Sequence, residues 1–305
     1  MREAHPAAWA VVVTYHPELT GFLLQLSSLL KQCAGVVVVD NGSGPELAAA
    51  ISSHFGGKLE LIELGENQGI AAAQNAGIDL ARRNGASHVV LFDHDSQPAP
   101  DMVQRLLACW ARLTAEGLRV GSVGPCYQDE RQSNPPPFIR VRGLRLKRCL
   151  VPESEDSVEV DYLIASGCLI PVSVLDDAGG MNEALFIDYV DIEWGLRARS
   201  MGYTNHGCFS ARMAHSLGDE PISFLGTAYP ARSPLRHYYM FRNAVLLYRM
   251  RHIPRHWKIA DGLRGILRFG FYALFARPRL SHLKMMLLGL KHGFCGAAGR
   301  LHRYP

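Results

Sequence analysis

Four short apolar runs constrain the fold of this chain more than any other feature of its sequence. They recur at intervals of roughly 25 residues, and segments with a helical pattern lie between them. The runs are Trp9–Thr14, Val36–Val39, Leu59–Leu64 and Val89–Phe92. Alternating strands and helices of this length are typical of right-handed βαβ units. We therefore expect an α/β fold with a parallel sheet, in which the first ~100 residues form a nucleotide-binding half.

Composition narrows the class of protein. Of the 305 residues, 48% are hydrophobic and 20% are charged, which is typical of a folded protein with one large or two modest domains. The seven cysteines form no C-x-x-C pair, which argues against a disulfide framework or a structural zinc site and fits a reducing cytoplasm. The N-terminus carries no secretory signal, and no uncharged apolar run reaches the roughly 18 residues of a membrane span. We expect a cytoplasmic protein that does not cross a membrane.

Charge is distributed unevenly along the chain. The net charge is +4, but residues 231–305 contain 15 lysines or arginines and a single acid, Asp261, whereas the first 230 residues contain 17 basic residues and 27 acids. In the basic tail, cations alternate with aromatic and leucine residues. Two interpretations remain open: the tail attaches to an anionic membrane surface, or it forms a helical bundle that closes an acceptor cleft. Nucleic acid is a poorer partner, because no nucleic-acid-reading motif accompanies the charge.

The fourth apolar run leads directly into Asp93-His94-Asp95. Ligands of an open α/β sheet collect beyond the carboxyl ends of its strands. Two carboxylates at that point can hold a divalent cation, Mg²⁺ or Mn²⁺, against the phosphates of a nucleotide sugar. A D-x-D triplet alone is a weak signal, but its place after a buried strand makes it informative. His94 is interpreted as an exposed spacer.

Polar residues follow the other predicted strands as well. Thr14 ends the first strand and Asp40 the second, where a carboxylate could accept the ring N–H of a pyrimidine or a ribose hydroxyl; a simple tight turn is the alternative for Asp40. The third strand leads through Asn67-Gln68-Gly69 into a helix of small residues, with Asn75 as its polar exception. Such a helix could approach a ligand closely and face phosphates with its N-terminus, or it could simply pack tightly on the sheet.

Three acids cluster at the start of a predicted helix over residues 191–201. A carboxylate of Asp188, Asp191 or Glu193 could act as a general base toward an acceptor hydroxyl, although acids also favour helix N-termini for dipole reasons. Arg197 lies one turn after Glu193 and could pair with it, which leaves Asp191 as the freer base. His215 stands near the end of the last predicted strand of the second half, and a lone histidine is more often structural than a metal ligand.

Taken in order, these motifs resemble those of the family 2 inverting glycosyltransferases of the GT-A type. The likeness is greatest to the bacterial rhamnosyltransferases of O-antigen, lipopolysaccharide and other cell-surface polysaccharide synthesis. The motifs that carry it are Val11–Tyr15, Val39–Ser43, Asn67–Gly69 with Asn75, Asp93–Asp95, Phe186–Arg199 and the segment of His215. The resemblance implies a Rossmann-like GT-A fold with a mixed central sheet and a helical, basic C-terminal extension. We expect a nucleotide-sugar-binding half (1–125), an acceptor-binding and catalytic half (126–230) and a basic amphipathic helical tail (231–305).

The resemblance also implies roles for particular residues. Asp191 falls at the position of the catalytic base, but Val190 stands where the family has an acid, so Asp188 or Glu193 could assist. The metal ligands implied are Asp93, Asp95 and His215. The implied nucleotide-sugar contacts are Thr14, Tyr15, Asp40, Asn41, Asn67, Gly69, Asn75, Asp93 and Arg242.

The implied activity is transfer of L-rhamnose from dTDP-L-rhamnose to a hydroxyl group of a lipid-linked glycan, with inversion and with help from a divalent cation. A tail on the inner face of the cell membrane would bring the site to such an acceptor. Two alternatives remain. A sugar-1-phosphate nucleotidyltransferase usually has a glycine-rich, basic phosphate loop, which is absent after Thr14. A non-catalytic sugar-nucleotide-binding protein is disfavoured because Asp93, Asp95 and Asp191 are all present.

Overall fold

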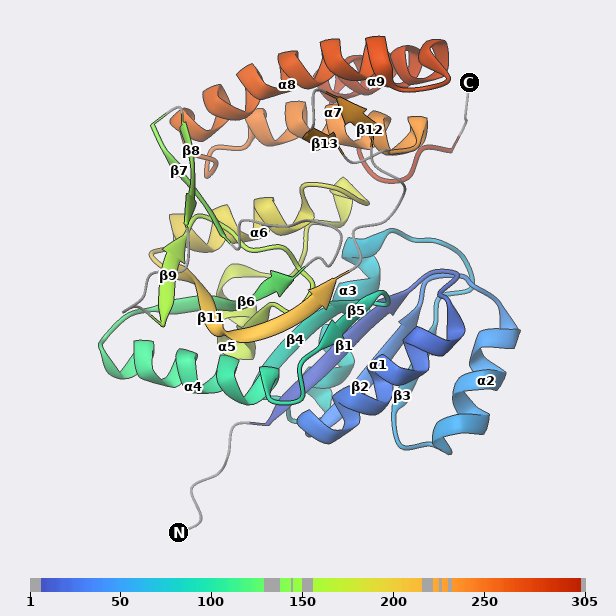
Figure 1. The fold of residues 1–305 in the computed structure, drawn as a ribbon, viewed down its shortest axis with the longest axis vertical. Coiled ribbons are helices and arrows are strands. Elements are labelled where there is room, and N and C mark those ends of the chain that lie inside the picture. The colour runs from blue at the N-terminus through green and yellow to red at the C-terminus, as the bar shows by residue number, and fades with distance from the viewer. Residues whose placement is uncertain are drawn as a thin grey trace.

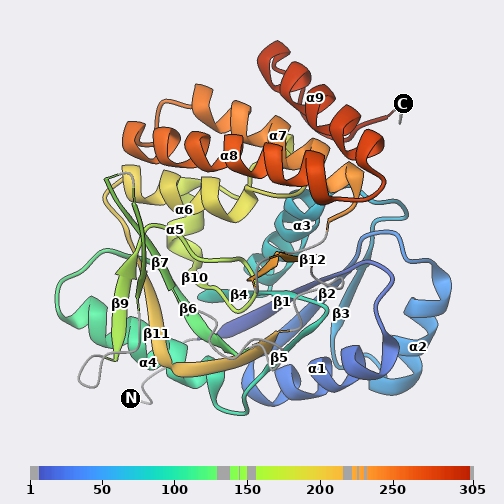
Figure 2. The same ribbon diagram turned by 45° about the horizontal axis from the view of Figure 1, so that its top comes forward.

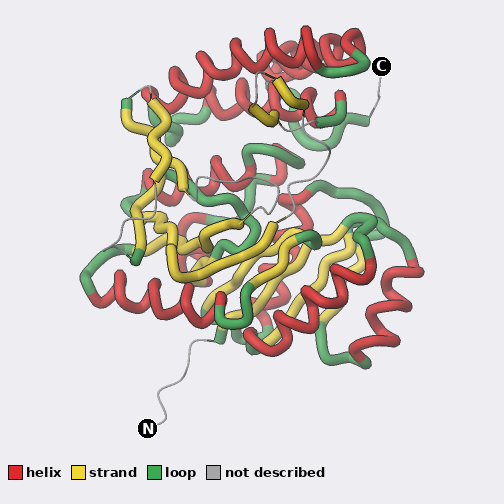
Figure 3. The backbone as a smooth tube through the Cα atoms, viewed as in Figure 1, coloured by secondary structure: helices red, strands yellow, loops and turns green. Residues whose placement is uncertain are grey.

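The fold is built on one nine-stranded sheet with helices on both faces (Figures 1 and 3). The computed structural model describes residues 7–128, 138–143, 145–149, 156–215, 222–224, 227–229 and 232–302. Along the main path of the sheet the strand order is β3-β2-β1-β4-β10-β6-β11-β5, and β9 pairs with β11. The sheet is mixed, as the resemblance implied, whereas the apolar runs by themselves indicated a parallel sheet.

The four apolar runs form the parallel half of this sheet. They are β1 (Ala8–Thr14), β2 (Gly35–Asp40), β3 (Glu60–Glu63) and β4 (His88–Asp93). β1 lies between β2 and β4 and is parallel to both, and β2 is parallel to β3. β1, β2 and β4 are almost wholly buried, which explains why their sequences are continuous apolar runs. Their carboxyl ends therefore reach the same edge of the sheet.

The second half of the sheet continues from β4. β10 (Leu169–Pro171) is antiparallel to both β4 and β6 (Val120–Gln128), and β11 (Thr204–His215) is parallel to β6. β5 (Ser96–Pro98) and β9 (Ser157–Val160) are antiparallel to β11. Only two residues separate β5 from β4 in the chain, but β5 pairs with β11 rather than with β4, so Asp95 lies in the short connection where the chain leaves β4.

Alternate residues of the strands pack against two separate helical layers. Val11 and Val13 of β1 belong to the core under α3 (Ile70–Arg83), α5 (Val172–Ala178) and α6 (Val190–Ser200). Ala10 and Val12 belong to the core under α1 (Leu19–Gln32), α2 (Pro45–Phe55) and α4 (Met102–Ala115). The period of two along each strand thus supplies both faces of the sheet.

The basic tail is helical, as the sequence predicted. It comprises α7 (Pro234–Arg249), α8 (Arg255–Phe275) and α9 (Arg279–Cys295), which stack above α6 and α3 (Figure 2). α7 is mostly buried, whereas α8 and α9 lie on the outside. A short 3₁₀ turn, η1 (Glu183–Leu185), and two hairpins, β7 (Phe138–Arg142) with β8 (Arg145–Cys149) and β12 (Ile222–Phe224) with β13 (Thr227–Tyr229), complete the elements described. Within the described ranges, no helix has the length and apolar character needed to cross a bilayer.

The division into three segments stays a prediction. The boundary proposed at residue 125 falls inside β6, so the first two segments share one sheet. The boundary at residue 231 lies shortly before α7 begins at Pro234.

Close packing of α3 on the sheet generates a testable prediction. A Cβ atom added at Gly77 would overlap Val11 Cγ1 and lie 3.0 Å from Val39 Cγ2, whereas a Cβ at Gly265 of α8 would meet nothing within 4 Å. We expect Gly77→Ala to lower the free energy of unfolding by about 1–3 kcal/mol despite its better helix propensity. Gly265→Ala should leave that free energy unchanged or raise it by up to about 1 kcal/mol. Urea unfolding measures both, and equal effects of the two variants would contradict this packing.

Candidate functional site

Polar residues at the ends of β1, β2 and β4 share one edge of the sheet. In the register, Thr14 pairs with Asp40, and Val13 pairs with Asp93. Thr14 is fully buried, and its hydroxyl has no hydrogen-bond partner within the residues described. A buried polar group of this kind is usually satisfied by something bound, such as water or a ligand. Both carboxylate oxygens of Asp40 accept the N–H of Ser43 at 3.0 Å, so Asp40 also closes the turn that follows β2.

The loop before α3 is held by two asparagines. Asn41 Nδ2 donates to Asn67 Oδ1 (3.2 Å), and Asn41 Oδ1 accepts the N–H of Gln68 (2.8 Å). Asn67 Oδ1 also accepts the N–H of Gly69 (3.0 Å). These two amides therefore shape the loop, which lies beside the ends of β1 and β2. Tyr15 is 44% exposed at the same edge, so its ring is accessible from solvent.

This loop meets the segment that precedes α6. Gly69 has φ +92°, and a Cβ there would lie 2.6 Å from atoms of Phe186. Ile70 N–H donates to Phe186 O (2.8 Å). Asn75 Nδ2 donates to Met181 O (3.0 Å) and to Glu183 Oε1 (2.7 Å). Gly69 and Asn75 thus connect the loop before α3 and α3 itself to residues 181–186, which precede the acids of α6.

Asp93 and Asp95 lie at the mouth of β4. Asp93 is partly buried; its N–H donates to Ser166 Oγ (3.1 Å), and its carbonyl accepts from Gln25 Nε2 (2.7 Å). Asp95 is exposed. His215 pairs through its backbone with Ser96, the residue after Asp95, while the side chain of His215 lies outside the described part of the structure. β11 thus brings the His215 backbone beside the D-x-D segment from a position 120 residues away in the chain.

Asp191 stands in the first turn of α6 and lines a narrow cavity with Leu91, Cys168 and Trp194. Burial, helped by the negative charges of Asp188 and Asp93, raises the pKa of Asp191 to about 6, although the N–H of Ile192 stabilises the carboxylate and opposes this shift. Leu91, which lines this cavity with Asp191, stands two residues before Asp93 in β4, so the end of β4 and the start of α6 lie close together. The structure therefore brings the D-x-D segment and the candidate base to one region.

The other two acids form ion pairs. The Asp188 carboxylate contacts Arg232 (2.7 Å) and Arg236 (2.8 Å). Burial alone would raise the pKa of Asp188, but these two guanidinium groups hold it below its usual value. Glu193 is buried and pairs with Arg197 (3.0 Å), as predicted from their spacing, and with His252 (2.8 Å). Of the three carboxylates, Asp191 is the one for which the described residues supply no cation.

The segment between η1 and α6 has an unusual backbone. Phe186, Asp188 and Tyr189 have φ values of +64°, +65° and +66°, a region that costs residues with a side chain of order 1–3 kcal/mol each. We call residues 186–189 the strained segment. Asn243 Nδ2 donates to the carbonyls of Leu185 (2.8 Å), Ile187 (2.8 Å) and Asp188 (2.9 Å). One side chain of α7 thus anchors most of this segment.

Arg242 reinforces the same anchor. It is fully buried, and its guanidinium donates to Leu185 O (2.9 Å), Gly299 O (2.5 Å) and Asn243 Oδ1 (2.9 Å). The ring of Phe186 stacks on Tyr239, with centroids 4.9 Å apart. These contacts place Arg242 next to the strained segment and not among the strand ends. The proposed donor site therefore does not include Arg242.

Two residues of this region were not singled out in the sequence. Ser166 Oγ lies 2.7 Å from Ser96 Oγ and accepts the Asp93 N–H, and Tyr127 OH donates to Ser166 O (2.9 Å). The pKa of Tyr127 is raised by burial and by nearby negative charges that include Asp191 and Asp93. The available signal was the position of Ser166 directly before Gly167, shortly before the apolar residues of β10.

Comparison with known proteins places this chain among sugar-transferring enzymes. The family model described as glycosyl transferase family 2 matches residues 10–156. The dTDP-rhamnosyl transferase RfbF of Shigella flexneri is 32% identical over 293 residues, which cover 95% of this chain and 96% of that protein. An N-acetylglucosaminyl-diphospho-decaprenol L-rhamnosyltransferase of Mycobacterium tuberculosis is 26% identical and covers 70% of this chain and 79% of the relative.

Solved structures share the fold. S. aureus TarS 1–349 in complex with UDP-GlcNAc has a TM-score of 0.57 and 16% sequence identity, over 95% of this chain and 81% of that one. GalNAc-T7 with UDP, GalNAc and Mn²⁺ has a TM-score of 0.63 and 14% identity, over 96% of this chain and 56% of that one. At these identities the likeness concerns the fold alone, and it confirms the predicted GT-A type of architecture.

The raised pKa of Asp191 predicts a pH-dependent stability effect. A carboxyl group whose pKa rises on folding, here from 3.8 to about 6, stabilises the fold below the lower value and loses that contribution as the pH rises through the higher one. We expect Asp191→Asn to raise the free energy of unfolding by about 2–3 kcal/mol at pH 8 and to change it little at pH 4.

The matched control is Asp79→Asn, because the side chain of Asp79 is 57% exposed. It should change the free energy of unfolding by less than about 0.5 kcal/mol at either pH. Chemical unfolding at both pH values measures the difference. A loss of stability of Asp191→Asn at pH 8 would contradict the electrostatic description of this site.

Proposed function

The chain belongs to glycosyl transferase family 2, and we propose that it transfers L-rhamnose from dTDP-L-rhamnose to a hydroxyl group of a lipid-linked glycan, with inversion. The observation that carries the mechanism is the proximity of Asp191, with its raised pKa, to the D-x-D segment at the end of β4. The identity of the donor is supported by the rhamnosyltransferase relatives, and a lipid-diphosphate acceptor by the name of the mycobacterial relative.

The donor nucleotide fits along the carboxyl edge of the parallel strands. Thr14 offers a buried hydroxyl without a partner in the described chain, and Asp40 offers carboxylate oxygens beside it. These groups suit the base and ribose of the nucleoside. Asn41 and Asn67 shape the loop in front of α3, and Tyr15 lies exposed beside it. Gly69 packs against Phe186 of the strained segment, and Asn75 binds Met181 and Glu183 just before that segment.

The end of β4 has ligands suited to a divalent cation. Asp93 and Asp95 supply oxygen atoms, the ligand type that Mg²⁺ and Mn²⁺ prefer, and the backbone of His215 lies next to them. Proteins commonly bind Mg²⁺ through one or two carboxylates together with substrate phosphates, and Asp93 and Asp95 suit that arrangement. When bound, such a cation would neutralise charge on the departing nucleoside diphosphate.

Asp191 is the proposed general base. Its carboxylate takes the proton of the acceptor hydroxyl as that oxygen attacks the anomeric carbon, and the bond from this carbon to the diphosphate oxygen breaks in the same displacement. Asp188 pairs with Arg232 and Arg236, and Glu193 pairs with Arg197, so these two acids act on the position and electrostatics of the segment rather than on the proton. A pKa near 6 leaves Asp191 deprotonated at neutral pH and still basic enough to accept a proton.

The outer helices are suited to a membrane surface. On α8 the exposed side chains of Ile259, Leu263, Ile266, Leu267 and Leu274 recur with helical spacing along one face. On α9 exposed Leu280, Leu287 and Phe294 alternate with exposed Lys284 and Lys291. Such a surface can place apolar side chains in the lipid interface and cations against anionic headgroups. We therefore propose peripheral attachment to the inner face of the cell membrane, where a lipid-linked acceptor is found.

Substitution of the proposed base tests the mechanism. We expect Asp191→Asn to lower kcat by about 10²–10⁴-fold while the affinity for dTDP-L-rhamnose stays nearly unchanged. Asp95→Asn should instead weaken donor binding in the presence of Mg²⁺ or Mn²⁺. For the unaltered enzyme, kcat/KM should rise with pH and level off above about 6, because Asp191 must be deprotonated. Weaker donor binding with normal turnover in Asp191→Asn would exclude Asp191 as the base.

Co-sedimentation with liposomes tests the membrane surface. The protein should bind vesicles that contain phosphatidylglycerol at low salt, and high salt should weaken binding. Ile266→Gln combined with Leu267→Gln should reduce the bound fraction several-fold. Leu24→Gln is the control, because Leu24 is 63% exposed on α1, at the opposite end of the molecule from α8 (Figure 1). Binding that the double variant does not change, or that α1 governs equally, would refute this surface.

A further inference from the structure

A second cavity, of about 280 Å³, lies away from the strand ends, between β7, α6 and the start of α8. Its volume is near the lower end of the range for small-ligand pockets, roughly 300–1,000 Å³, so it suits a small group rather than a whole nucleotide. Its polar lining comes from four separate parts of the chain: Arg140, Asp161, Arg199, and His256 with Trp257. We call it the α8 cavity.

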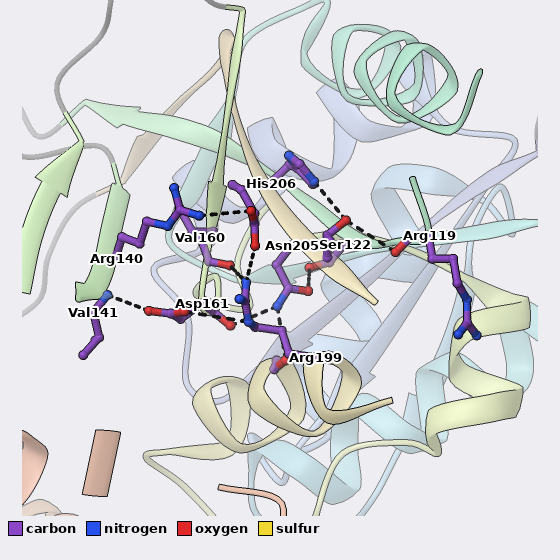
Figure 4. A network of polar contacts seen from close by, with 12 residues as sticks. Arg119, Ser122, Arg140, Val141, Val160, Asp161, Arg199, Asn205 and His206 are labelled. Atoms are coloured by element: carbon purple, nitrogen blue, oxygen red, sulfur yellow. Dashed lines mark hydrogen bonds and ion pairs between the residues drawn. The ribbon is translucent and has the colours of Figure 1, made fainter. Parts of the chain in front are cut away.

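The lining of the α8 cavity is rich in hydrogen-bond donors. Arg140 and Arg199 line it with partly exposed guanidinium groups, at 26% and 29% exposure, and His256 is exposed. Each arginine pairs with Glu159, which does not line the cavity, at 3.0 Å and 2.8 Å. The one lining carboxylate, Asp161, is also engaged: Oδ2 accepts the N–H of Val141 (2.5 Å), and Oδ1 lies 3.7 Å from Arg199 Nε (Figure 4). A guanidinium group carries five N–H donors, so the pairs with Glu159 leave further donors on both arginines, and donors outnumber acceptors in the lining. This balance favours an anionic ligand that carries many oxygens.

Trp257 adds an independent observation. Its side chain is 1% exposed and lines the cavity, yet its Nε1–H has no hydrogen-bond partner among the residues that the structure describes. Leaving such a buried donor unpaired destabilises the fold, so a bound acceptor oxygen would remove this penalty.

The start of α8 also favours an anionic ligand. Pro254 is the N-cap of this 21-residue helix, lines the cavity and provides no side-chain cap, and the first turn contains no acid. The unpaired N–H groups and the positive end of the helix dipole add to the attraction for an anion.

The α8 cavity lies between the proposed base and the proposed membrane surface. Arg199 is eight residues after Asp191 on α6, about 12 Å along the helix axis. Residues 161–163 run from this cavity to the other, because Asp161 lines the α8 cavity and Leu163 lines the cavity of Asp191. On its other side, the cavity is bounded by α8, whose exposed apolar face begins at Ile259. A group held here would thus lie between a reacting sugar and a lipid chain.

We propose that the α8 cavity binds the diphosphate that links the acceptor glycan to its lipid carrier. The proposal rests on the proposed function for the nature of the acceptor. The phosphate oxygens accept from Arg140, Arg199, His256 and the Trp257 indole, the attached sugar reaches toward Asp191, and the lipid chain leaves along α8.

An NMR titration tests this binding without turnover. In ¹⁵N-tryptophan-labelled full-length protein, with EDTA present and no sugar nucleotide, the indole signal of Trp257 is assigned by its loss in Trp257→Phe. We expect inorganic pyrophosphate and farnesyl diphosphate each to shift this signal saturably, because Nε1–H gains an acceptor. Arg140→Gln and His256→Gln should each weaken pyrophosphate binding about tenfold. The matched control Arg255→Gln removes an exposed cation of the same helical turn that does not line the cavity, and it should change the affinity less than twofold.

Three other results would overturn the proposal in whole or in part. The absence of a saturable shift of the Trp257 signal, or an equal loss of affinity in Arg255→Gln, overturns the site. Binding of inorganic phosphate as tightly as pyrophosphate, with no binding of farnesyl diphosphate, overturns its assignment to the lipid carrier. Thermal unfolding of each variant separates a lost contact from a lost fold. Hydrolysis of dTDP-L-rhamnose by the unaltered enzyme reports on the proposed function alone, so failure of either proposal can be recognised separately.

Discussion

The anchoring of the strained segment by α7 is the interaction on which the rest of the site depends. Three residues with side chains adopt positive φ there, and the three carbonyls that accept from Asn243 help to keep them in place. Because α6 begins directly after this segment, the direction of the Asp191 side chain depends on the anchor. Gly69 and Ile70 contact the same segment from the nucleotide side, so one short stretch of backbone connects both halves of the site.

Electrostatics then distinguish the three acids of this region. Asp188 pairs with Arg236 of α7 and with Arg232 just before it, and Glu193 pairs with Arg197 of α6. Asp191 experiences burial and two negative neighbours without such compensation within the described structure, which raises its pKa to about 6. The same arrangement that makes Asp191 a suitable base makes its charged form costly to the fold, a common conflict between stability and function at reactive sites.

The C-terminal helices combine the two roles that the charge pattern left open. α7 is mostly buried, and Arg232 and Arg236 contact Asp188 of the strained segment. These contacts correspond to the interpretation in which the tail forms part of the cleft. α8 and α9 present basic and apolar side chains outward, which belongs to the interpretation as a membrane surface. The α8 cavity lies where these two functions meet, because its lining comes from β7, α6 and the first turn of α8.

Local sequence determined the strands, the helix over residues 70–83, the place of Asp93 and Asp95 beyond β4, and the helical, basic tail. These features depend on apolar periodicity, small residues and charge, which are properties of neighbouring residues. The sequence also predicted that Arg197 pairs with Glu193, since the two are one helical turn apart. Only the tertiary structure could show that Asp188 pairs with Arg232 and Arg236, that Asn243 holds a strained backbone, and that Arg242 lies beneath it. Those contacts join residues more than 40 positions apart, and no local pattern specifies which distant side chains will meet once the sheet and helices have packed.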